Sequence, residues 1–224
     1  MMDTVLELKG ISKRDGAGRS VLHGLNFMVK RTERVCVQGD RDELTALARV
    51  IGGIDRPETG EVYLLGLRLN EMDDGTIAAF RGEHIGHASC DPGLWSELTV
   101  LENTAMPLTV AGVYRRERVE AAFAALEAVG MAYAAHVYSK SLSLCELRLT
   151  ALARALVHAP ELLVLEDALA GLDQRETDRF VDTLERRWIS DGFALLYLTG
   201  DANKKIHTDK TLALMYGQFQ GAGI

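Results

Sequence analysis

Short apolar stretches divide this chain into regularly spaced elements. Residues 4–9 alternate apolar and polar side chains, as expected of a strand with one buried face. Four further stretches are short and mainly apolar, and they lie at 34–37, 61–65, 162–165 and 194–198. The stretch at 162–165 runs directly into two acidic residues, as a buried parallel strand does at its carboxyl end. Each of these five stretches predicts a strand.

Apolar residues at spacings of three and four predict helices between these strands. The predicted helices cover 43–51, 115–129, 146–158 and 174–188. Val119 and Phe123 belong to the predicted buried face of the second one. The run Thr99-Val-Leu-Glu102 is a capping box that opens a further helix, because both side chains can bond backbone N–H groups of the first turn. Gly39 is predicted to begin a turn before the helix at 43–51.

The order of these elements indicates the fold class. Strands alternate with helices at both ends of the chain, and a helical block at about 92–158 lies between. This order predicts an α/β fold, in which a parallel sheet forms the core and a helical lobe is inserted. The chain has 224 residues, enough for one domain with a sizeable core.

Composition and charge exclude several classes of protein. Hydrophobic residues make up 47% of the chain and charged residues 25%, as in soluble globular proteins. The formal net charge of −7 argues against a nucleic-acid partner. No apolar run approaches the ~18 residues of a membrane span, and residues 1–9 lack the apolar stretch of a secretory signal. Three widely spaced cysteines predict a reduced, cytosolic chain without a disulfide framework, and no metal site is expected.

Several stretches in order resemble the ATP-binding subunit of ABC transporters. Residues 52–62 resemble the segment after the family's phosphate loop, and residues 85–86 with 97–103 resemble the start of its helical lobe. Residues 151–156 resemble the helix behind the signature motif, and residues 162–173 resemble the Walker B strand and D-loop. The resemblance covers nearly the whole chain and is closest to the branch that serves lipoprotein release and macrolide export.

This resemblance implies a fold and partners. The fold is a P-loop NTPase-like ABC core with a parallel sheet, an antiparallel β subdomain and an inserted helical subdomain. The core would cover 1–90 and 159–224, and the helical subdomain about 91–158. The implied partners are an integral-membrane permease and a second nucleotide-binding subunit, identical or different. The chain is therefore expected on the cytoplasmic face of the membrane, held there by the permease.

The phosphate loop departs from the family pattern G-x-x-x-x-G-K-[ST]. This chain reads Gly39-Asp-Arg-Asp-Glu-Leu-Thr-Ala46, which lacks the lysine and is one residue short. The candidate remnants of a nucleotide site are Gly39, Arg41, Thr45 and Ala46. Three acidic residues would face the phosphate, and one like-charge pair at ~4 Å costs about 1 kcal/mol in water and about 4 kcal/mol at a partly buried site. That exceeds the ~0.3–1 kcal/mol offered by an exposed helix N-terminus, so a plain strand–turn–helix is the favoured interpretation.

The Walker B acids are present in reversed order. The family has Asp then Glu, which hold magnesium and orient the attacking water, whereas this chain has Glu166 then Asp167. Asp167 is one methylene shorter than the usual base, and a misplacement of ~1 Å can cost about a hundredfold in rate. Both residues are candidate catalytic groups with impaired geometry. The alternative is an acidic strand end without chemistry.

The remaining catalytic motifs are also altered. The signature reads Leu142-Ser-Leu-Cys-Glu146, in which Ser143 can still reach a phosphate but two glycines are lost. Cys90 takes the place of the Q-loop glutamine and Gly200 that of the switch histidine. Arg14-Asp15 stands where an aromatic residue would stack on adenine.

Two segments are expected at interfaces by analogy with the family. The D-loop, Ala170-Gly-Leu-Asp173, is complete, and it places Asp173 at the contact between subunits unless the segment is a simple turn. Cys90, Leu94 and Trp95 lie where the family receives a short helix of the permease. A core position for Trp95 is the alternative.

Six altered motifs predict a fold that is retained for contacts rather than for turnover. The leading hypothesis is a degenerate ABC subunit that docks on a permease in a structural or regulatory role, with no cofactor. ATP and Mg²⁺ are expected only if nucleotide binds at all. The alternatives are a weakly active ATPase that energises export, and a soluble interaction protein derived from an ABC subunit.

Overall fold

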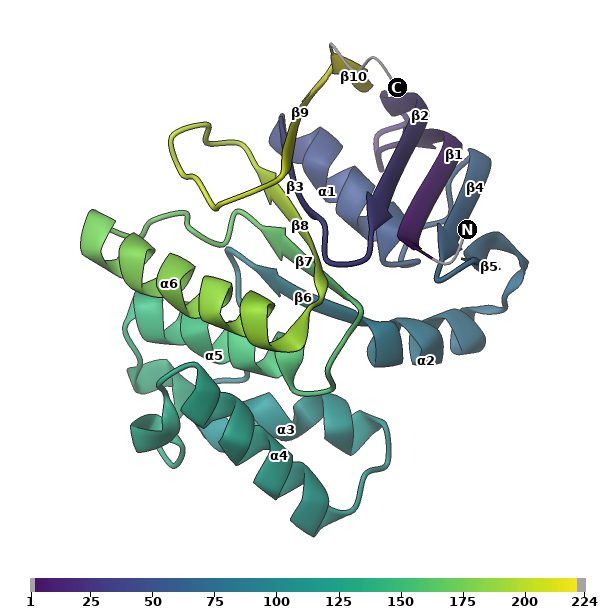
Figure 1. Ribbon diagram of the computed structural model, residues 1–224. Helices are drawn as coiled ribbons and strands as arrows, with labels where there is room; N and C mark the ends of the chain where they lie inside the picture. The colour runs from purple at the N-terminus through teal and green to yellow at the C-terminus, as the bar shows by residue number, and fades with distance from the viewer. Residues whose placement is uncertain (1–2, 221–224) are drawn as a thin grey trace.

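The computed structural model describes residues 3–220, which form two β-sheets and the helices around them (Figure 1). Residues 1–2 and 221–224 of the predicted domain lie outside the described residues. The division into a core at 1–90 and 159–224 and a helical subdomain stays a prediction.

A six-stranded sheet forms the centre of the molecule, with the order β10-β9-β3-β8-β7-β6. Its strands are β3 (Arg34–Gly39), β6 (Ile85–Ser89), β7 (Leu162–Glu166), β8 (Ala194–Thr199), β9 (Lys210–Met215) and β10 (Gln218–Gln220). All neighbours pair in parallel except β10, which is antiparallel to β9. The α/β class with a parallel sheet is thereby confirmed, and the carboxyl ends of five strands meet at one edge.

A second, antiparallel sheet has the order β2-β1-β4-β5. Its strands are β1 (Thr4–Arg14), β2 (Ser20–Lys30), β4 (Thr59–Leu64) and β5 (Leu67–Arg68). The strand predicted at 4–9 therefore continues to Arg14. Leu65, predicted as the end of a strand, lies in the turn between β4 and β5 instead, with a φ of 52°.

The helices occupy both faces of the central sheet (Figure 1). They are α1 (Arg41–Ile51), α2 (Asp74–His84), α3 (Val100–Val110), α4 (Arg115–Ala128), α5 (Leu144–Leu156) and α6 (Gln174–Asp191), with single 3₁₀ turns at Leu69–Glu71, Ala132–Ala134 and Ser139–Ser141. Helix α1 packs between the two sheets, whereas α5 and α6 lie on the opposite face of the central sheet, with α3 and α4 beyond α5.

Capping side chains explain where two helices differ from the prediction. Helix α5 begins at Leu144 rather than Glu146, because Ser143 and Glu146 form a capping box at its start. Helix α1 begins at Arg41 rather than Glu43, because the Asp40 side chain accepts the backbone N–H of Asp42. Thr99 and Glu102 form the predicted capping box of α3.

The predicted buried face of α4 is only half correct. Ala122 and Leu126 are buried, but Val119 is 38% exposed and Phe123 is 40% exposed. Helix α4 is the outer helix of its layer and packs on α3 and α5 from one side (Figure 1). The buried face of α4 is therefore narrower than the stripe of apolar residues in its sequence. Within residues 3–220, no helix is long and apolar enough to cross a membrane.

Candidate functional site

The junction of β3 and α1 is the first part of the candidate site. Asp40 is the only residue between the strand and the helix, so the turn predicted to begin at Gly39 is wrong. Gly39 is the last residue of β3 and pairs with Leu214 of β9. Arg41, Thr45 and Ala46 lie within the first two turns of α1. The residues predicted as a phosphate loop are therefore helical, apart from Gly39 and Asp40.

Asp40 takes one of the N–H groups that this helix N-terminus would offer to an anion, that of Asp42, whereas its bond to Leu44 is the first ordinary bond of the helix. Its Oδ1 accepts the N–H of Asp42 at 3.0 Å, and its backbone carbonyl accepts the N–H of Leu44 at 2.9 Å. The side chain of Leu44, a residue of α1, is buried in the core. A carboxylate thus occupies the position that a phosphate would need.

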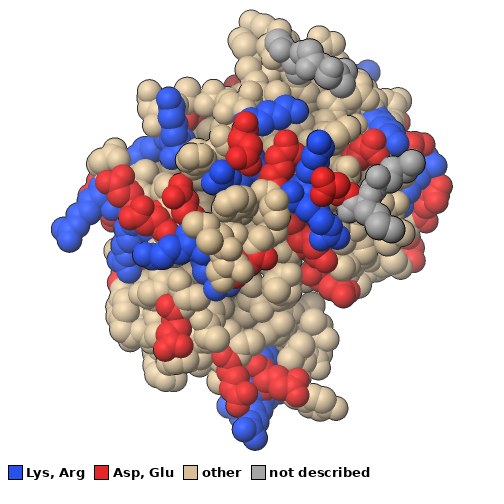
Figure 2. Space-filling view, in the orientation of Figure 1, with Lys and Arg blue, Asp and Glu red and all other residues tan. Residues whose placement is uncertain are grey.

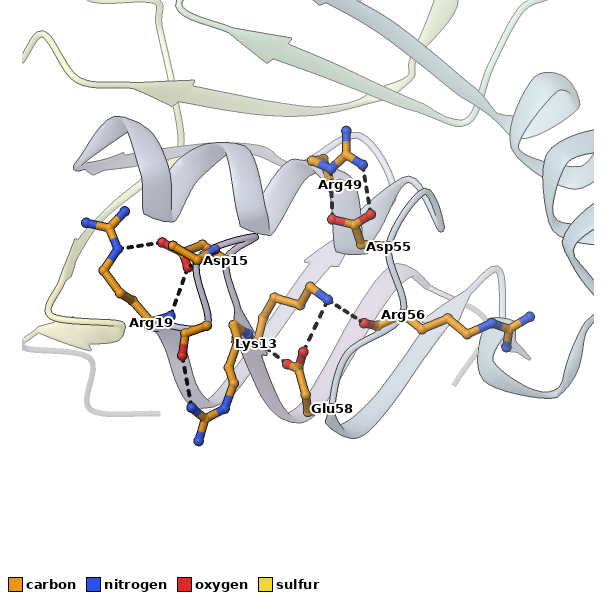
Figure 3. Close-up of polar contacts among 10 residues, drawn as sticks. Lys13, Asp15, Arg19, Arg49, Asp55, Arg56 and Glu58 are labelled. Atoms are coloured by element: carbon orange, nitrogen blue, oxygen red, sulfur yellow. Dashed lines mark hydrogen bonds and ion pairs between the residues drawn. The ribbon is translucent and has the colours of Figure 1, made fainter.

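A cavity of about 740 Å³ lies beside this junction, between the β1–β2 turn and α1. It is lined by residues 13–17 and Arg19, by five residues of α1 and by Asp55 and Glu58, none of which is aromatic. Figure 3 shows that the side chains bordering it point toward one another and form ion pairs. Arg14 and Asp15 stand where the family has an aromatic residue. Among the described residues that line this cavity, no aromatic ring is therefore available to stack on a base.

Each of the four carboxylates in this cavity is paired with a basic residue. Arg19 donates to Asp15 at 2.6 Å and to Asp42 at 3.1 Å, and so joins the β1–β2 turn to α1. The other two pairs are Lys13 with Glu58 at 3.3 Å and Arg49 with Asp55 at 2.8 Å. The hydrogen bonds from Arg49 hold the pKa of Asp55 below its ordinary value, so this carboxylate stays ionised at neutral pH. Exposed pairs of this kind contribute little to stability, but they occupy three of the five basic residues that line the cavity.

The two acids after β7 are bound to groups of the protein. Glu166 ends β7, and its carboxylate is hydrogen-bonded to Nε2 of His87 on the neighbouring strand β6. Asp167 follows at a φ of 45°, and its Oδ1 accepts the N–H of Gly200 at 3.0 Å. Gly200 is the residue in place of the switch histidine. Among residues 3–220, no group of three or more histidine, cysteine, aspartate or glutamate residues could hold a metal ion.

His87 was not found from the sequence. The bond to Glu166 connects residues that are 79 positions apart, and it depends on the parallel pairing of β6 with β7. To find this contact from the sequence, one would have had to predict β6 as a strand and to place it beside the strand at 162–165.

The signature segment caps a helix. Oγ of Ser143 donates to Oε2 of Glu146 at 2.8 Å, and the same carboxylate oxygen accepts the N–H of Ser143. Leu144 is 37% exposed, whereas Cys145 is buried, and burial raises the pKa of its thiol. The hydroxyl predicted to reach a phosphate is thus occupied within its own chain.

The predicted interface residues lie outside the cavity beside the β3–α1 junction. Asp173 caps α6 by accepting the N–H of Glu176 at 2.8 Å. Cys90 follows β6, and its N–H donates to the carbonyl of Glu166 at 2.8 Å. Trp95 is 61% exposed, which excludes the alternative that it is a core residue. Leu94 beside it is half-buried.

A second cavity of about 420 Å³ lies between α1, the end of α2, α3 and the end of α5. Thr45 and Glu166 both line it, so the structure brings together a residue of the predicted loop and one Walker B acid. His87 and Arg49 also line this cavity. Ser143, Trp95 and Asp173 do not.

Comparison with known proteins gives a consistent result. A family model described as ABC transporter matches residues 22–170. The lipoprotein-releasing system ATP-binding protein LolD of Chromohalobacter salexigens is 32% identical over an alignment of 220 residues, and the match covers 96% of this chain and 93% of that protein. LolD of Geobacter metallireducens is 32% identical over 97% of this chain and 98% of its own length. An uncharacterised ABC transporter ATP-binding protein of Escherichia coli, YbbA, is 29% identical over 97% of each chain.

Solved structures show the same relationship. The ATP-binding cassette MJ0796, described in a dimeric post-hydrolysis state bound to ADP and Pi, superposes with a TM-score of 0.86 at 25% identity. The match covers 96% of both chains. CbiO1 of Clostridium perfringens, part of the transporter complex cbiONQ, has a TM-score of 0.86 at 21% identity and supports the fold alone.

Proposed function

This chain belongs to the ABC transporter ATP-binding family, and we propose that it is a non-catalytic member that docks on a membrane permease. Its role in the assembly would be structural or regulatory. It would lie at the cytoplasmic face of the membrane, held there by the permease. The relatives named for lipoprotein release make a permease of that branch the natural partner.

The observation that carries this proposal is the junction of β3 and α1. A phosphate loop surrounds phosphate with successive backbone N–H groups, and this arrangement requires several residues outside regular structure. Here a single residue separates the strand from the helix, and its carboxylate already accepts the N–H of Asp42. The chain also has no lysine between Lys30 and Lys140. Neither the backbone cradle nor the lysine is present to hold a phosphate.

The acidic residues that would hold magnesium and water support the same conclusion. Glu166 is bound to His87, and Asp167 accepts the N–H of Gly200. Each carboxylate would have to leave a protein donor before it could act on a metal or a water. These contacts give both acids a structural role that needs no catalysis.

The isolated chain is expected to bind MgATP weakly or not at all. Isothermal titration calorimetry at millimolar nucleotide should show no heat beyond that of dilution. The reason is that the phosphate loop, its lysine and the aromatic residue that would stack on adenine are all missing. A titration with sodium chloride of matched ionic strength controls for screening of the ion pairs around Arg19. A dissociation constant in the low micromolar range would contradict the proposal and favour the weakly active ATPase.

The cavity of about 420 Å³ has the character of a docking cleft for a helix of the permease. Its rim includes Ile54, which is 54% exposed, and Pro107 of α3. Arg154 extends from α5 across its wall and donates to the carbonyls of Pro92 at 2.5 Å and Gly93 at 2.9 Å. The loop that carries Trp95 is thereby joined to the cleft.

Trp95 itself is held rigidly by its backbone while its ring remains exposed. Its N–H donates to Oδ1 of Asn103 at 2.8 Å, and its carbonyl accepts from Nδ2 of Asn103 at 3.0 Å and from Oγ of Ser139 at 2.7 Å. An exposed tryptophan on a fixed backbone loses little conformational freedom on binding. Such a residue is suited to anchor an interface.

Replacement of Trp95 by alanine is expected to weaken association with the permease by about 2 kcal/mol, roughly thirtyfold in the dissociation constant. The fold should stay intact, because the ring is mostly solvent-exposed and the bonds to Asn103 use backbone atoms. Ile189→Ala on α6 is the matched control, since Ile189 is 75% exposed and lies outside the cleft. Equal co-purification of the folded Trp95→Ala chain and the control would show that Trp95 is not an anchor.

Purification of the native complex tests the function as a whole. The expected result is co-purification of an integral-membrane permease with this chain. Recovery of the chain without a membrane protein would favour the soluble interaction protein. On the face shown in Figure 2, acidic and basic side chains are mixed without a basic stripe, which supports a protein partner rather than a nucleic acid.

A further inference from the structure

We propose that the turn between α3 and α4 contacts the surface of an anionic lipid bilayer. Val110 ends α3, Tyr114 precedes α4, and Arg115 and Arg116 are the first two residues of α4. We call these four residues the helical tip. The inference goes beyond the proposed function and rests on it in one respect, because the permease would hold the chain at the membrane. It adds a direct contact with lipid.

The helical tip presents two large apolar side chains to solvent. Val110 is 82% exposed and Tyr114 is 79% exposed. Among the large apolar residues of the described part of the chain, only Ile189 and Tyr216 are exposed to 75% or more as well, and each of these belongs to a different element. Single exposed apolar residues are normal, but two side by side at one turn indicate a contact surface.

Hydrogen bonds fix the backbone of this turn. The N–H of Val113 donates to the carbonyl of Leu108 at 3.0 Å, and Gly112 makes the bend at a φ of 76°. Nη1 of Arg118 donates to the carbonyl of Val113 at 3.1 Å, and the N–H of Arg118 donates to the carbonyl of Tyr114 at 3.0 Å. The two apolar side chains therefore project from an ordered turn, and little backbone freedom is lost when they are buried.

The charge at the helical tip is locally positive in a chain whose formal net charge is −7. No acidic residue occurs between Glu102 and Glu117, whereas Arg115 and Arg116 follow Tyr114 directly. Arg115 forms no ion pair with any described residue, and Arg116 is 3.0 Å from Glu120 in an exposed pair that contributes little to stability. Cations at the start of a helix oppose its dipole, so helix stability does not account for them.

An anionic bilayer is the occupant that matches both features. At its surface, phosphate groups lie next to acyl chains, so arginine can pair with phosphate while valine and the tyrosine ring are buried beside it. Tyrosine is enriched at this depth of membranes because its ring is apolar and its hydroxyl is polar.

The position of the helical tip also favours lipid. Pro107 lines the cleft of about 420 Å³, and Val110 follows it by three residues, so both lie on nearly the same side of α3. The turn is at the edge of the helical layer, away from both sheets (Figure 1). A permease helix in the cleft would bring this edge close to the surrounding lipid. A projecting turn contacts a flat surface without a matching hollow, which favours the bilayer over the permease itself.

Flotation of the purified full chain with vesicles tests this inference. At low ionic strength, the chain should float with vesicles of phosphatidylglycerol and phosphatidylcholine in equal amounts, and not with phosphatidylcholine alone. Val110→Ser with Tyr114→Ser should lower the partition coefficient about tenfold or more. Ile189→Ser with Tyr216→Ser is the matched control, because it removes an aliphatic side chain and a tyrosine of similar exposure elsewhere. Circular dichroism and thermal unfolding establish that each variant is folded.

The arginines give a second comparison. Arg115→Gln with Arg116→Gln should lower the partition coefficient about fivefold for each arginine, and added salt should weaken binding of the parent chain. Arg175→Gln with Arg179→Gln on α6 is the matched control, since both residues are exposed and the net charge changes equally.

A fluorescent reporter shows whether the turn itself meets the lipid. In a Trp95→Phe background, the emission of Tyr114→Trp should shift to the blue with anionic vesicles and be quenched by brominated lipid. Ile189→Trp in the same background should show neither change.

The outcomes separate this inference from the proposed function. A folded chain that does not float with anionic vesicles at low ionic strength would overturn the lipid contact, and co-purification of a permease would still support the proposed function. Vesicle binding without a co-purifying permease would support the contact and contradict the proposed function. Equal binding by the tip variants and their controls would overturn the stated surface. Loss of the permease from Val110→Ser with Tyr114→Ser in detergent, without vesicle binding by the parent chain, would assign the turn to the permease instead.

Discussion

Replacing Gly86 with alanine is expected to destabilise the protein by about 3 kcal/mol or more, because the new methyl group would overlap backbone. A Cβ at Gly86 would lie 2.2 Å from the carbonyl oxygen of Ala155 and 3.0 Å from Cγ of Pro160. Gly86 lies in β6, and Ala155 is in the last turn of α5, which packs on this strand. Neither backbone can move freely, since β6 pairs with β7 and α5 is buried along most of its length.

Gly82→Ala is the matched control, and it should change the free energy of unfolding in the opposite direction. Gly82 lies in α2, and nothing lies within 4 Å of the position that its Cβ would take. Alanine in a helix is favoured over glycine by ~0.5–1 kcal/mol, so this variant should be slightly more stable. Urea unfolding followed by circular dichroism measures both changes. A Gly86→Ala protein as stable as the parent would show that α5 and β6 can separate at no cost.

The close approach at Gly86 also explains part of the sequence resemblance. The pair Ile85-Gly86 could be recognised as a family feature, but its reason is a contact between β6 and a helix 69 positions further along the chain. No local pattern predicts such a contact. The strand itself was not predicted, because five residues that include glycine, histidine and serine show no alternation.

Regular elements were predicted well where one local signal dominates. The strands at 162–165 and 194–198 are uniformly apolar, and each extends by only one residue in the structure. The prediction for β1 ended at Lys9 because Gly10 interrupts the alternation, yet the strand continues through a bulge in which Gly10 has a φ of 62°. In β2, Val21 and Leu22 are both buried, so its alternation is broken as well, and the strand was missed.

The altered motifs of the candidate site could be identified from the sequence, but the contacts that their residues make could not. The missing lysine and the reversed order of Glu166 and Asp167 are properties of the sequence and needed no structure. The ion pair of Arg19 with Asp42 and the bond of His87 to Glu166 connect distant segments through the fold. The sequence also did not show that the former loop is helical. That outcome depends on the hydrogen bond from the N–H of Asp42 to the side chain of Asp40.

The helical junction also decides how the acids after β7 should behave in the assembled transporter. A metal that bridges nucleotide and protein needs phosphate oxygens on one side and a free carboxylate on the other. Under the proposed function, the short junction would not hold the first, and the bonds to His87 and Gly200 engage the second. Under the proposed function, the acids serve to form these hydrogen bonds at the carboxyl edge of the sheet.

Asp167→Asn together with Glu166→Gln is expected to leave any ATP turnover of the native complex unchanged. Both substitutions keep an oxygen acceptor, so the bonds from Gly200 and His87 can persist and the fold is preserved. A complex of two copies of this chain should show no turnover in either form. If an intact cassette is present, turnover arises at that subunit's own site, and replacing its Walker B glutamate should reduce the rate about a hundredfold or more. Steady-state phosphate release by the purified complex measures each case. Loss of turnover through the double substitution here, with turnover kept when the partner's glutamate is replaced, would identify this chain as the ATPase.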